Sequence, residues 1–340
     1  MHPVDLVKAR GGPAQLVVWQ DGRLVLDEAV GCPPDALFWT FSAGKPFTAL
    51  AVHLLAERGR LDLDEPVARY WPEFGANGKD RITTRHVLQH RSGLYAARSV
   101  LRDGIAMTSW DRSIRAIETA RPRWPAGAGP AYQVVSYGFM LGELVQRITG
   151  EPVADFVTRE LFEPLGLRDT YLGLPDEQWP RHVPVRSRGA TGRASAAFFN
   201  RRAVRRSVVP AAGVSTTARD LARLYRMVLG GGMLDGVRIL SPETVAEACR
   251  PSSDGEVDRV VKLPMRWSHA FQLGGTDSGD RARPMGRLSS LAFGHNGSNC
   301  CIGWAEPARA VVFAYTSGWL IRGHEGARHL AELADAVLDG

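Results

Sequence analysis

Cysteine is scarce in this sequence. Its 340 residues include only Cys32, Cys249, Cys300 and Cys301, and no two of them stand in a C-x-x-C spacing. Neighbouring residues of a strand point to opposite faces, so the adjacent pair Cys300 and Cys301 does not form half of a zinc site. This scarcity also argues against a disulfide framework. We expect four buried thiols, no metal and no cofactor.

Long apolar runs are absent as well. No stretch of the chain is apolar over the length that a membrane-spanning helix needs. The opening residues, MHPVDLVKARGGP, lack the apolar run of a secretory signal, because Asp5 and Lys8 interrupt it. We therefore expect a cytoplasmic protein with no membrane partner. Its 44% hydrophobic and 23% charged residues are typical of a globular chain.

Lysine is nearly missing, and the positive charge is concentrated in one segment. The chain has 42 basic residues and a formal charge of +6. Residues 181–206 contain eight arginines and no acidic residue, so the rest of the chain is slightly acidic. We predict that this segment is a loop that either lies in solvent or holds an acidic substrate. Because no aromatic platform accompanies the arginines, nucleic acid is not an expected partner.

The hydrophobic pattern places strands at both ends of the chain. Residues 14–31 alternate around Asp21-Gly22, which is a strong hairpin signal. Residues 299–318 are typical of two further strands. Between these ends, helical periodicity interrupted by Gly and Pro predicts mostly helices, the first of them over residues 43–58.

This order of elements predicts an α/β fold. An antiparallel sheet flanked by helices would be built from both chain termini and would carry an inserted, mostly helical domain. We expect the sheet domain to comprise residues 1–70 and 207–340, and the helical domain residues 71–206. The cleft between the two domains is the expected active site. The sequence gives no indication of the oligomeric state.

The stretch TFSAGKPFTAL places Ser42 and Lys45 three residues apart at the predicted start of a helix. Side chains at this spacing share one face, and the helix N-terminus favours developing negative charge. A serine hydroxyl needs a base before it can attack, and a lysine at its ordinary pKa of about 10.4 is protonated. Burial can lower that pKa into a useful range. The alternative is a serine at a helix start beside a solvated lysine.

Four stretches of the chain carry a resemblance to a known family. They are FSAGKPFTALAVHLLAERGRLDLDEPVARYWPEF, ITTRHVLQHRSGL, PLGLRDTYL and PAAGVSTTARDLARL. They resemble the serine β-lactamase and penicillin-binding-protein superfamily, in the branch that holds class C β-lactamases, D-alanyl-D-alanine peptidases and related esterases and transacylases. The resemblance extends over residues 14–320. It implies a nucleophilic Ser42 activated with the help of Lys45.

The family's second motif, usually Y-x-N or Y-x-S, falls at Tyr132 here, with Val134 in its third position. This departs from the family, and we expect that Val134 can neither donate a hydrogen bond to a substrate amide carbonyl nor hold Lys45. Recognition of β-lactams or peptides in the usual manner is therefore in doubt. The resemblance implies that Tyr132, with its pKa drawn below about 10 by the Lys45 ammonium, accepts the Ser42 proton. Lys45 as the direct base is the alternative, and the sequence does not decide between them.

The third family motif, K-T-G or H-x-G, is matched by His295, Asn296 and Gly297. Histidine in this place is usual among the esterase-like members and implies a catalytic hydrogen-bonding role for His295. Asn296, Gly297 and Val134 are then expected substrate neighbours, since a glycine lets a substrate lie close to the strand. The resemblance also implies an oxyanion hole made by the backbone N–H groups of Ser42 and Ser298.

These residues predict a serine hydrolase or acyltransferase that acts on a small-molecule ester or amide. Its partners would be an acyl donor and water, an alcohol or an amine. One alternative is a β-lactamase or a D-alanyl-D-alanine carboxypeptidase, and another is a catalytically inactive binding module. Trp124, Trp267 and Trp319 either line the cleft or fill the core, and Tyr137 is expected to be a packing residue.

Overall fold

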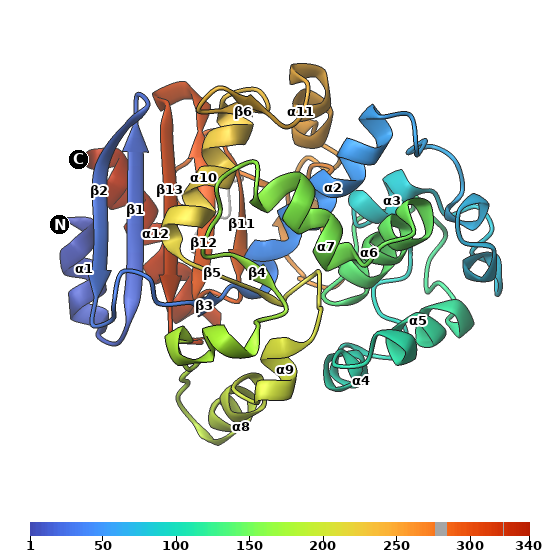
Figure 1. Ribbon diagram of the computed structural model, residues 1–340, viewed down its shortest axis with the longest axis horizontal. Helices are drawn as coiled ribbons and strands as arrows, with labels where there is room; N and C mark the ends of the chain where they lie inside the picture. The colour runs from blue at the N-terminus through green and yellow to red at the C-terminus, as the bar shows by residue number, and fades with distance from the viewer. Residues whose placement is uncertain (276–283, 322) are drawn as a thin grey trace.

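The computed structural model describes residues 1–275, 284–321 and 323–340 (Figure 1). Its main sheet has six antiparallel strands in the order β10-β11-β12-β13-β1-β2. In chain order they are β1 (Ala14–Gln20), β2 (Arg23–Val30), β10 (Gln272–Leu273), β11 (Phe293–Gly297), β12 (Cys301–Glu306) and β13 (Val311–Ser317). The first hairpin lies directly beside the last strand, with Ala14 opposite Ser317. The predicted antiparallel sheet, built from both ends of the chain, is confirmed.

Alternating side chains divide the core between the two faces of this sheet. Leu16 and Val18 of β1 pack under α1 (Pro3–Arg10) and α12 (Gly323–Asp339). Val17, between them, joins the larger core that includes α10 (Ala218–Leu229). Figure 1 shows α10 in front of the sheet and α12 behind it. This alternation is what the period of two along a strand requires when both faces are covered.

Helices fill the middle of the chain, as predicted. Helix α2 (Lys45–Glu57) runs through their centre and is buried from Lys45 to Leu55, because almost every residue after its first turn is apolar. Around it lie α3 (Thr84–Leu88), α4 (Val100–Ala106), α5 (Trp110–Thr119), α6 (Ser136–Thr149) and α7 (Val153–Val157). The other regular elements are β3 (Phe38–Trp39), β4 (Tyr171–Leu172), β5 (Val214–Thr216), β6 (Met233–Leu234), β7 (Val237–Arg238), α11 (Pro242–Cys249), β8 (Glu256–Val257) and β9 (Pro264–Met265). The proposed domain boundaries stay a prediction.

The arginine-rich segment 181–206 is not the loop that the sequence predicts. It contains α8 (Ala190–Phe199) and α9 (Arg202–Arg206), and Arg205 is completely buried. The Arg205 guanidinium donates to the carbonyls of Phe199 and Val183 at 2.9 and 3.1 Å. Alanine and glycine blur the periodicity of α8, which is why the pattern was not visible. The positive charge of Arg205 is therefore structural.

The cysteines only partly follow the prediction of four buried thiols. All four are free, but only Cys300 and Cys301 are buried, while Cys32 and Cys249 are partly exposed. The difference arises because Cys301 belongs to a central strand of the sheet and Cys300 to the buried turn before it, whereas Cys32 follows an edge strand and Cys249 ends a surface helix. In the described parts of the chain, no helix is long and apolar enough to span a membrane.

Candidate active site

Ser42 lies on a strained turn between β3 and α2. The turn is a 3-10 helix, Phe41–Gly44, so Ser42 precedes the α-helix and Lys45 is the first residue of α2. Phe41 has a φ of 49°, a left-handed conformation that is unfavourable for a bulky residue. It is held there because its buried ring packs edge-on against Phe199, with 4.9 Å between ring centroids. The packing fixes the backbone from which Ser42 projects.

The Lys45 ammonium lies beside the Ser42 hydroxyl in a dry environment. Its Nζ is 3.2 Å from the Ser42 Oγ, 2.8 Å from the Val134 carbonyl oxygen and 3.1 Å from the Ala211 carbonyl oxygen. Lys45 is 1% exposed, and burial lowers the pKa of its amine from 10.5 to about 7. A neutral amine has two N–H donors and one lone pair. Because the two carbonyls can only accept, they take both donors and leave the lone pair for the Ser42 proton.

This geometry corrects the expectation for Val134. The residue does hold Lys45, through its backbone carbonyl, which any residue in this position would supply. Its side chain lines the cavity described below. The departure from the family motif therefore leaves the lysine anchored and places an apolar side chain on the cavity wall.

Tyr132 also lies beside the Ser42 hydroxyl and shares a hydrogen bond with it. Its ring stacks on Trp267 with 5.1 Å between centroids and 9° between planes, and the Lys45 Nζ lies 4.9 Å from the ring centroid. Burial raises the pKa of Tyr132 above its ordinary value of 10.0, and a hydrogen bond with Ser42 offsets only part of this effect. The expectation of a pKa below 10 is wrong, because the loss of solvent around the phenol outweighs its neighbours. A tyrosine that stays protonated donates a hydrogen bond through its hydroxyl.

His295 reaches the same cavity from β11. It is 3% exposed, and burial, together with the Lys45 charge, lowers the pKa of its imidazole to about 3. Its Nδ1 lies 3.0 Å from the Asn296 carbonyl oxygen, so this nitrogen is the donor. The Nε2 atom is then an acceptor, and it is buried without a partner in the described residues. His295 is neutral and does not compete with Lys45 for a proton.

The turn after β11 brings Ser298 to the cavity that contains Ser42. Ser298 and Asn299 both have left-handed backbones, with φ of 50° and 58°. The Asn299 N–H donates to the Asn296 side chain at 2.9 Å, and the Asn296 amide donates back to that of Asn299 at 2.7 Å. Gly297 does not line the cavity. A Cβ on it would lie 1.9 Å from the Thr40 carbonyl oxygen, so its small size serves the close contact between β11 and the turn that carries Ser42.

One cavity of about 410 Å³ is lined by Ser42, Tyr132, Val134, His295, Asn296 and Ser298. Trp267 is the tryptophan that lines it, and neither Trp124 nor Trp319 does so. None of the eight arginines of segment 181–206 reaches it, so the acidic-substrate alternative for that segment gains no support from this cavity. Among the described residues the lining carries no Lys, Arg, Asp or Glu. The full lining is Ser42, Tyr132, Val134, Val261, Leu263, Met265, Trp267, Gln272, Pro284, His295, Asn296, Ser298, Asn299, Gly323, His324 and Ala327.

The chain is similar to proteins of one known family. A model of the family Beta-lactamase matches residues 6–338. The chain belongs to the beta-lactamase family. The resemblance seen in the sequence motifs is confirmed.

Beta-lactamase-family relatives with esterase names are similar over most of their lengths. Esterase/beta-lactamase LipL of Mycobacterium tuberculosis is 31% identical, over 92% of this chain and 78% of the relative. Esterase EstB of Burkholderia gladioli is 31% identical, over 70% of this chain and 68% of the relative. The crystal structure of a family VIII carboxylesterase has a TM-score of 0.85 and 26% identity, and the match covers 98% of this chain and 95% of that one. The predicted mixed fold with an antiparallel sheet is that of these beta-lactamase-family structures.

Sequence reasoning missed several groups that shape this beta-lactamase-family site. His90 contacts the Tyr132 ring with 4.8 Å between centroids, and its Nδ1 pairs with the Gln133 side chain at 3.1 Å. Tyr137, expected as packing, is buried against the same imidazole, 4.7 Å away. The motif HVLQHRSGL contains His90 and was a usable signal. The Ala211 carbonyl was not readable, because a backbone atom leaves no trace in residue identity.

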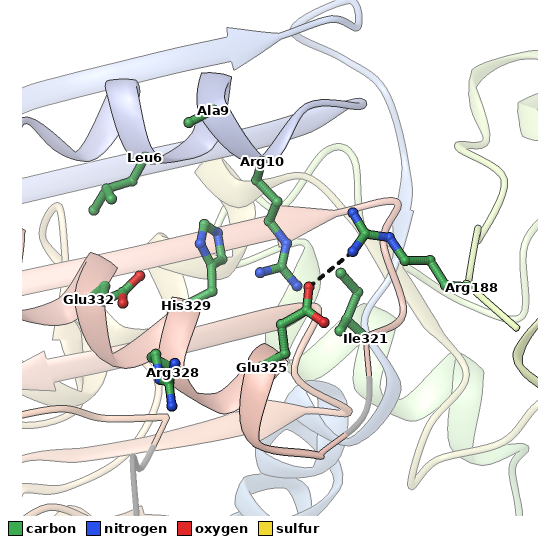
Figure 2. Close-up of a pocket in the computed structure, with 9 residues that line it drawn as sticks. All are labelled: Leu6, Ala9, Arg10, Arg188, Ile321, Glu325, Arg328, His329 and Glu332. Carbon is green, nitrogen blue, oxygen red and sulfur yellow. Dashed lines mark hydrogen bonds and ion pairs between the residues drawn. The ribbon is translucent and has the colours of Figure 1, made fainter.

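A second cavity of about 610 Å³ lies between α1 and α12 (Figure 2). Arg10 enters it from α1, and Arg188 closes one side with an ion pair to Glu325 at 3.3 Å. Burial and the Arg10 charge lower the pKa of the His329 imidazole to about 3. The cavity is lined by Leu6, Ala9, Arg10, Arg188, Ile321, Glu325, Arg328, His329 and Glu332. None of these side chains is a serine, cysteine or lysine, so Ser42 marks the candidate active site.

Proposed function

We propose that this chain is a serine esterase or transacylase that forms an acyl-enzyme on Ser42. The observation that carries the proposal is the environment of Lys45, whose buried amine has two carbonyls and the Ser42 hydroxyl as neighbours. At its pKa of about 7, Lys45 is neutral in about half of the molecules near pH 7. A base with a pKa near the working pH combines availability with proton affinity.

In the proposed acylation, neutral Lys45 takes the Ser42 proton while Oγ attacks the acyl carbon. The oxyanion that forms lies between the backbone N–H groups of Ser42 and Ser298. Tyr132, protonated and hydrogen-bonded to Ser42, gives its proton to the leaving alkoxide and regains one from the Lys45 ammonium. Water, an alcohol or an amine then attacks the acyl-enzyme with Lys45 again as base. No step needs a metal or cofactor.

The remaining site residues have supporting roles in this proposal. The neutral His295 offers its Nε2 as an acceptor to a hydroxyl of the substrate or of Tyr132. Asn296 lines the cavity beside it, and the apolar side chain of Val134 forms part of the wall. Gly297 acts indirectly, since it lets β11 approach the turn that carries Ser42.

An ester is the substrate class that we propose. The described cavity lining is largely apolar, with Val261, Leu263, Met265 and Trp267 on its wall. Val134 supplies no side-chain donor for a substrate amide, and the alkoxide of an ester is a better leaving group than the amide anion of an amide, so an ester depends less on protonation by Tyr132. Two relatives at 31% identity have esterase in their names.

A β-lactamase or carboxypeptidase-like amide hydrolase is the second candidate. One of those relatives is named both esterase and beta-lactamase, and it covers 92% of this chain. A binding module without catalysis is the third candidate, and the intact set of Ser42, Lys45, Tyr132 and His295 argues against it.

Intact-protein mass spectrometry with a fluorophosphonate tests the acyl-enzyme proposal. We expect one adduct on the wild type and none on Ser42→Ala. Ser113→Ala is the matched control, because Ser113 is buried in α5 and lies outside the cavity lining. Turnover of p-nitrophenyl esters, with or without added alcohols and amines, then separates hydrolysis from transfer. An adduct that persists on Ser42→Ala, or a folded wild type with neither adduct nor ester turnover, would contradict the proposal.

A further inference from the structure

A fully buried carboxylate, Asp258, lies directly behind Tyr132. It follows β8, and none of its surface is exposed. Its Oδ1 accepts from the backbone N–H of Tyr132 at 3.2 Å and from those of Val260 and Val261 at 2.8 Å each. Its Oδ2 accepts from the Trp267 indole N–H at 3.2 Å. Among the described residues, no ion pair involves Asp258, so four N–H donors balance its charge.

These four hydrogen bonds hold Tyr132 in two ways. The bond from its own N–H fixes the backbone of Tyr132 relative to the turn that begins at Asp258. The bond to the indole fixes the plane of Trp267, and that plane lies against the Tyr132 ring at 5.1 Å and 9°. One carboxylate therefore fixes both the backbone position of Tyr132 and the orientation of its ring.

The turn that carries Asp258 is also fastened to the segment that leads into Tyr132. The Arg259 N–H donates to the Pro130 carbonyl at 2.9 Å, and the Arg259 guanidinium donates to the Ala128 carbonyl at 2.6 Å. Val261, in the same turn, is part of the cavity wall. The Oδ1 bonds of Asp258 to Val260 and Val261 fix this turn, and the turn fixes the segment that carries the tyrosine.

The negative charge of Asp258 has a further effect. It adds to burial in raising the pKa of Tyr132, because a nearby anion disfavours the phenolate. The hydroxyl beside Ser42 consequently stays protonated over the range in which Lys45 titrates. This is the state that proton donation to a leaving group requires.

We propose that Asp258 is a positioning residue, which holds Tyr132 in place beside Ser42 through the backbone N–H of Tyr132 and through Trp267. The inference rests on the proposed function, because it gives Tyr132 a place in acyl transfer. Asp258 itself touches neither Ser42 nor the cavity. Its effect should therefore appear in the rate of acylation and not in substrate binding.

Two substitutions remove the same hydrogen bond from opposite ends. In Asp258→Asn the amide oxygen can still accept the three backbone N–H groups, but its NH2 then faces the Trp267 N–H as donor against donor. In Trp267→Phe the aromatic ring remains and the N–H is lost. A misplacement of about 1 Å at a reacting group can cost roughly 100-fold in rate. We expect each variant to acylate 10- to 100-fold more slowly, and the double variant to be no slower than the slower single one.

The assay is the rate of ester acylation per active site, with sites counted by the fluorophosphonate adduct. Asp220→Asn is the control for loss of a buried carboxylate. Asp220 is 6% exposed, accepts from the Asp169 N–H at 2.7 Å and the Thr170 hydroxyl at 2.9 Å, and does not line the cavity. We expect this control to stay within twofold of the wild type. In Asp258→Asn, kcat should fall while KM stays within twofold of the wild-type value. The basic limb of the pH profile should move to lower pH, because the loss of the Asp258 charge lowers the pKa of Tyr132.

Each outcome decides between the two proposals. A wild type that labels on Ser42 together with an Asp258→Asn rate within twofold overturns the positioning role and leaves the proposed function intact. Additive losses in the double variant overturn it too, because independent sites add. A wild type that never labels overturns both. If Asp258→Asn does not fold, Trp267→Phe decides alone, and an unchanged rate in that variant is again a refutation.

Discussion

The sharpest consequence of the site is that acylation should titrate with Lys45. At a pKa of about 7, the neutral fraction of Lys45 is about 10% at pH 6 and about 90% at pH 8. An ordinary lysine would be only about 0.04% neutral at pH 7, so burial raises the amount of active base by roughly a thousandfold. The rate of acylation should therefore rise about tenfold from pH 6 to pH 8.

The two buried histidines of the site cannot produce this rise. Burial and the Lys45 charge lower the pKa of His295 to about 3 and that of His90 well below 6.5. A further histidine, His324, lines the cavity together with His295. Replacing it by alanine should leave the acidic limb where it is, whatever the effect on the rate.

Stopped-flow release of p-nitrophenol in the first turnover measures this limb without interference from deacylation. The fluorophosphonate labelling rate, followed by mass, gives the same limb with a different electrophile. A rate that is flat from pH 6 to pH 8 would refute the reasoning, and so would a limb that shifts in His324→Ala. Either result would mean that Lys45 is not the group whose proton state controls attack.

Three further predictions concern stability and the role of charge. Lys45→Met should abolish acylation yet stabilise the fold by up to about 5 kcal/mol at pH 7, because the unfolded chain binds a proton that the buried amine gives up. Since the pKa of Lys45 is lower in the folded state, the stability of the wild type in urea should rise with pH between about 7 and 10.5. This dependence on pH should vanish in the variant. Gly297→Ala should cost roughly 1–3 kcal/mol in urea unfolding and slow acylation, since its Cβ would lie 1.9 Å from the Thr40 carbonyl oxygen; a variant as stable and active as the wild type would contradict this. Arg193→Glu combined with Arg201→Glu should leave KM for neutral and acidic esters within twofold, because neither side chain lines the cavity; a KM that rises only for acidic esters would restore the substrate role of that segment.

The sequence predicted the parts of the site that depend on side-chain identity and spacing. Ser42 and Lys45, three residues apart, do lie within 3.2 Å of each other. His295 and Tyr132 reach the same cavity, although they come from a strand and an irregular segment far apart in the chain. Residue type and order suffice for such assignments, because they record which chemistry is present.

What sequence reasoning could not supply was the environment of those side chains. The predicted direction of the pKa shift of Tyr132 was wrong, because desolvation is a property of the packed state and outweighs any single neighbour. The anchoring of Lys45 depends on the backbone carbonyls of Val134 and Ala211. Every residue type has this group, so the sequence contains no signal for it. Asp258 lies outside the recognised motifs, and only the fold brings it behind Tyr132.

The same limit explains the fold-level error. The helices of segment 190–206 are short and rich in alanine and arginine, so no apolar stripe marks them. Arg205 is buried in spite of its charge because backbone carbonyls accept its hydrogen bonds. The hairpin 14–31, in contrast, was predicted correctly, since its alternation and turn are local signals.

Gly297 and Thr40 are far apart in the sequence, and their contact brings β11 against the turn that carries Ser42. A growing polypeptide cannot complete this site until its last sheet strands have emerged, so hydrolytic competence should arrive only with the finished fold. A translation product truncated before residue 297 would contain Ser42 and Lys45 and still be inert. Covalent labelling of Ser42 can therefore serve as a counter of fully assembled molecules during biosynthesis.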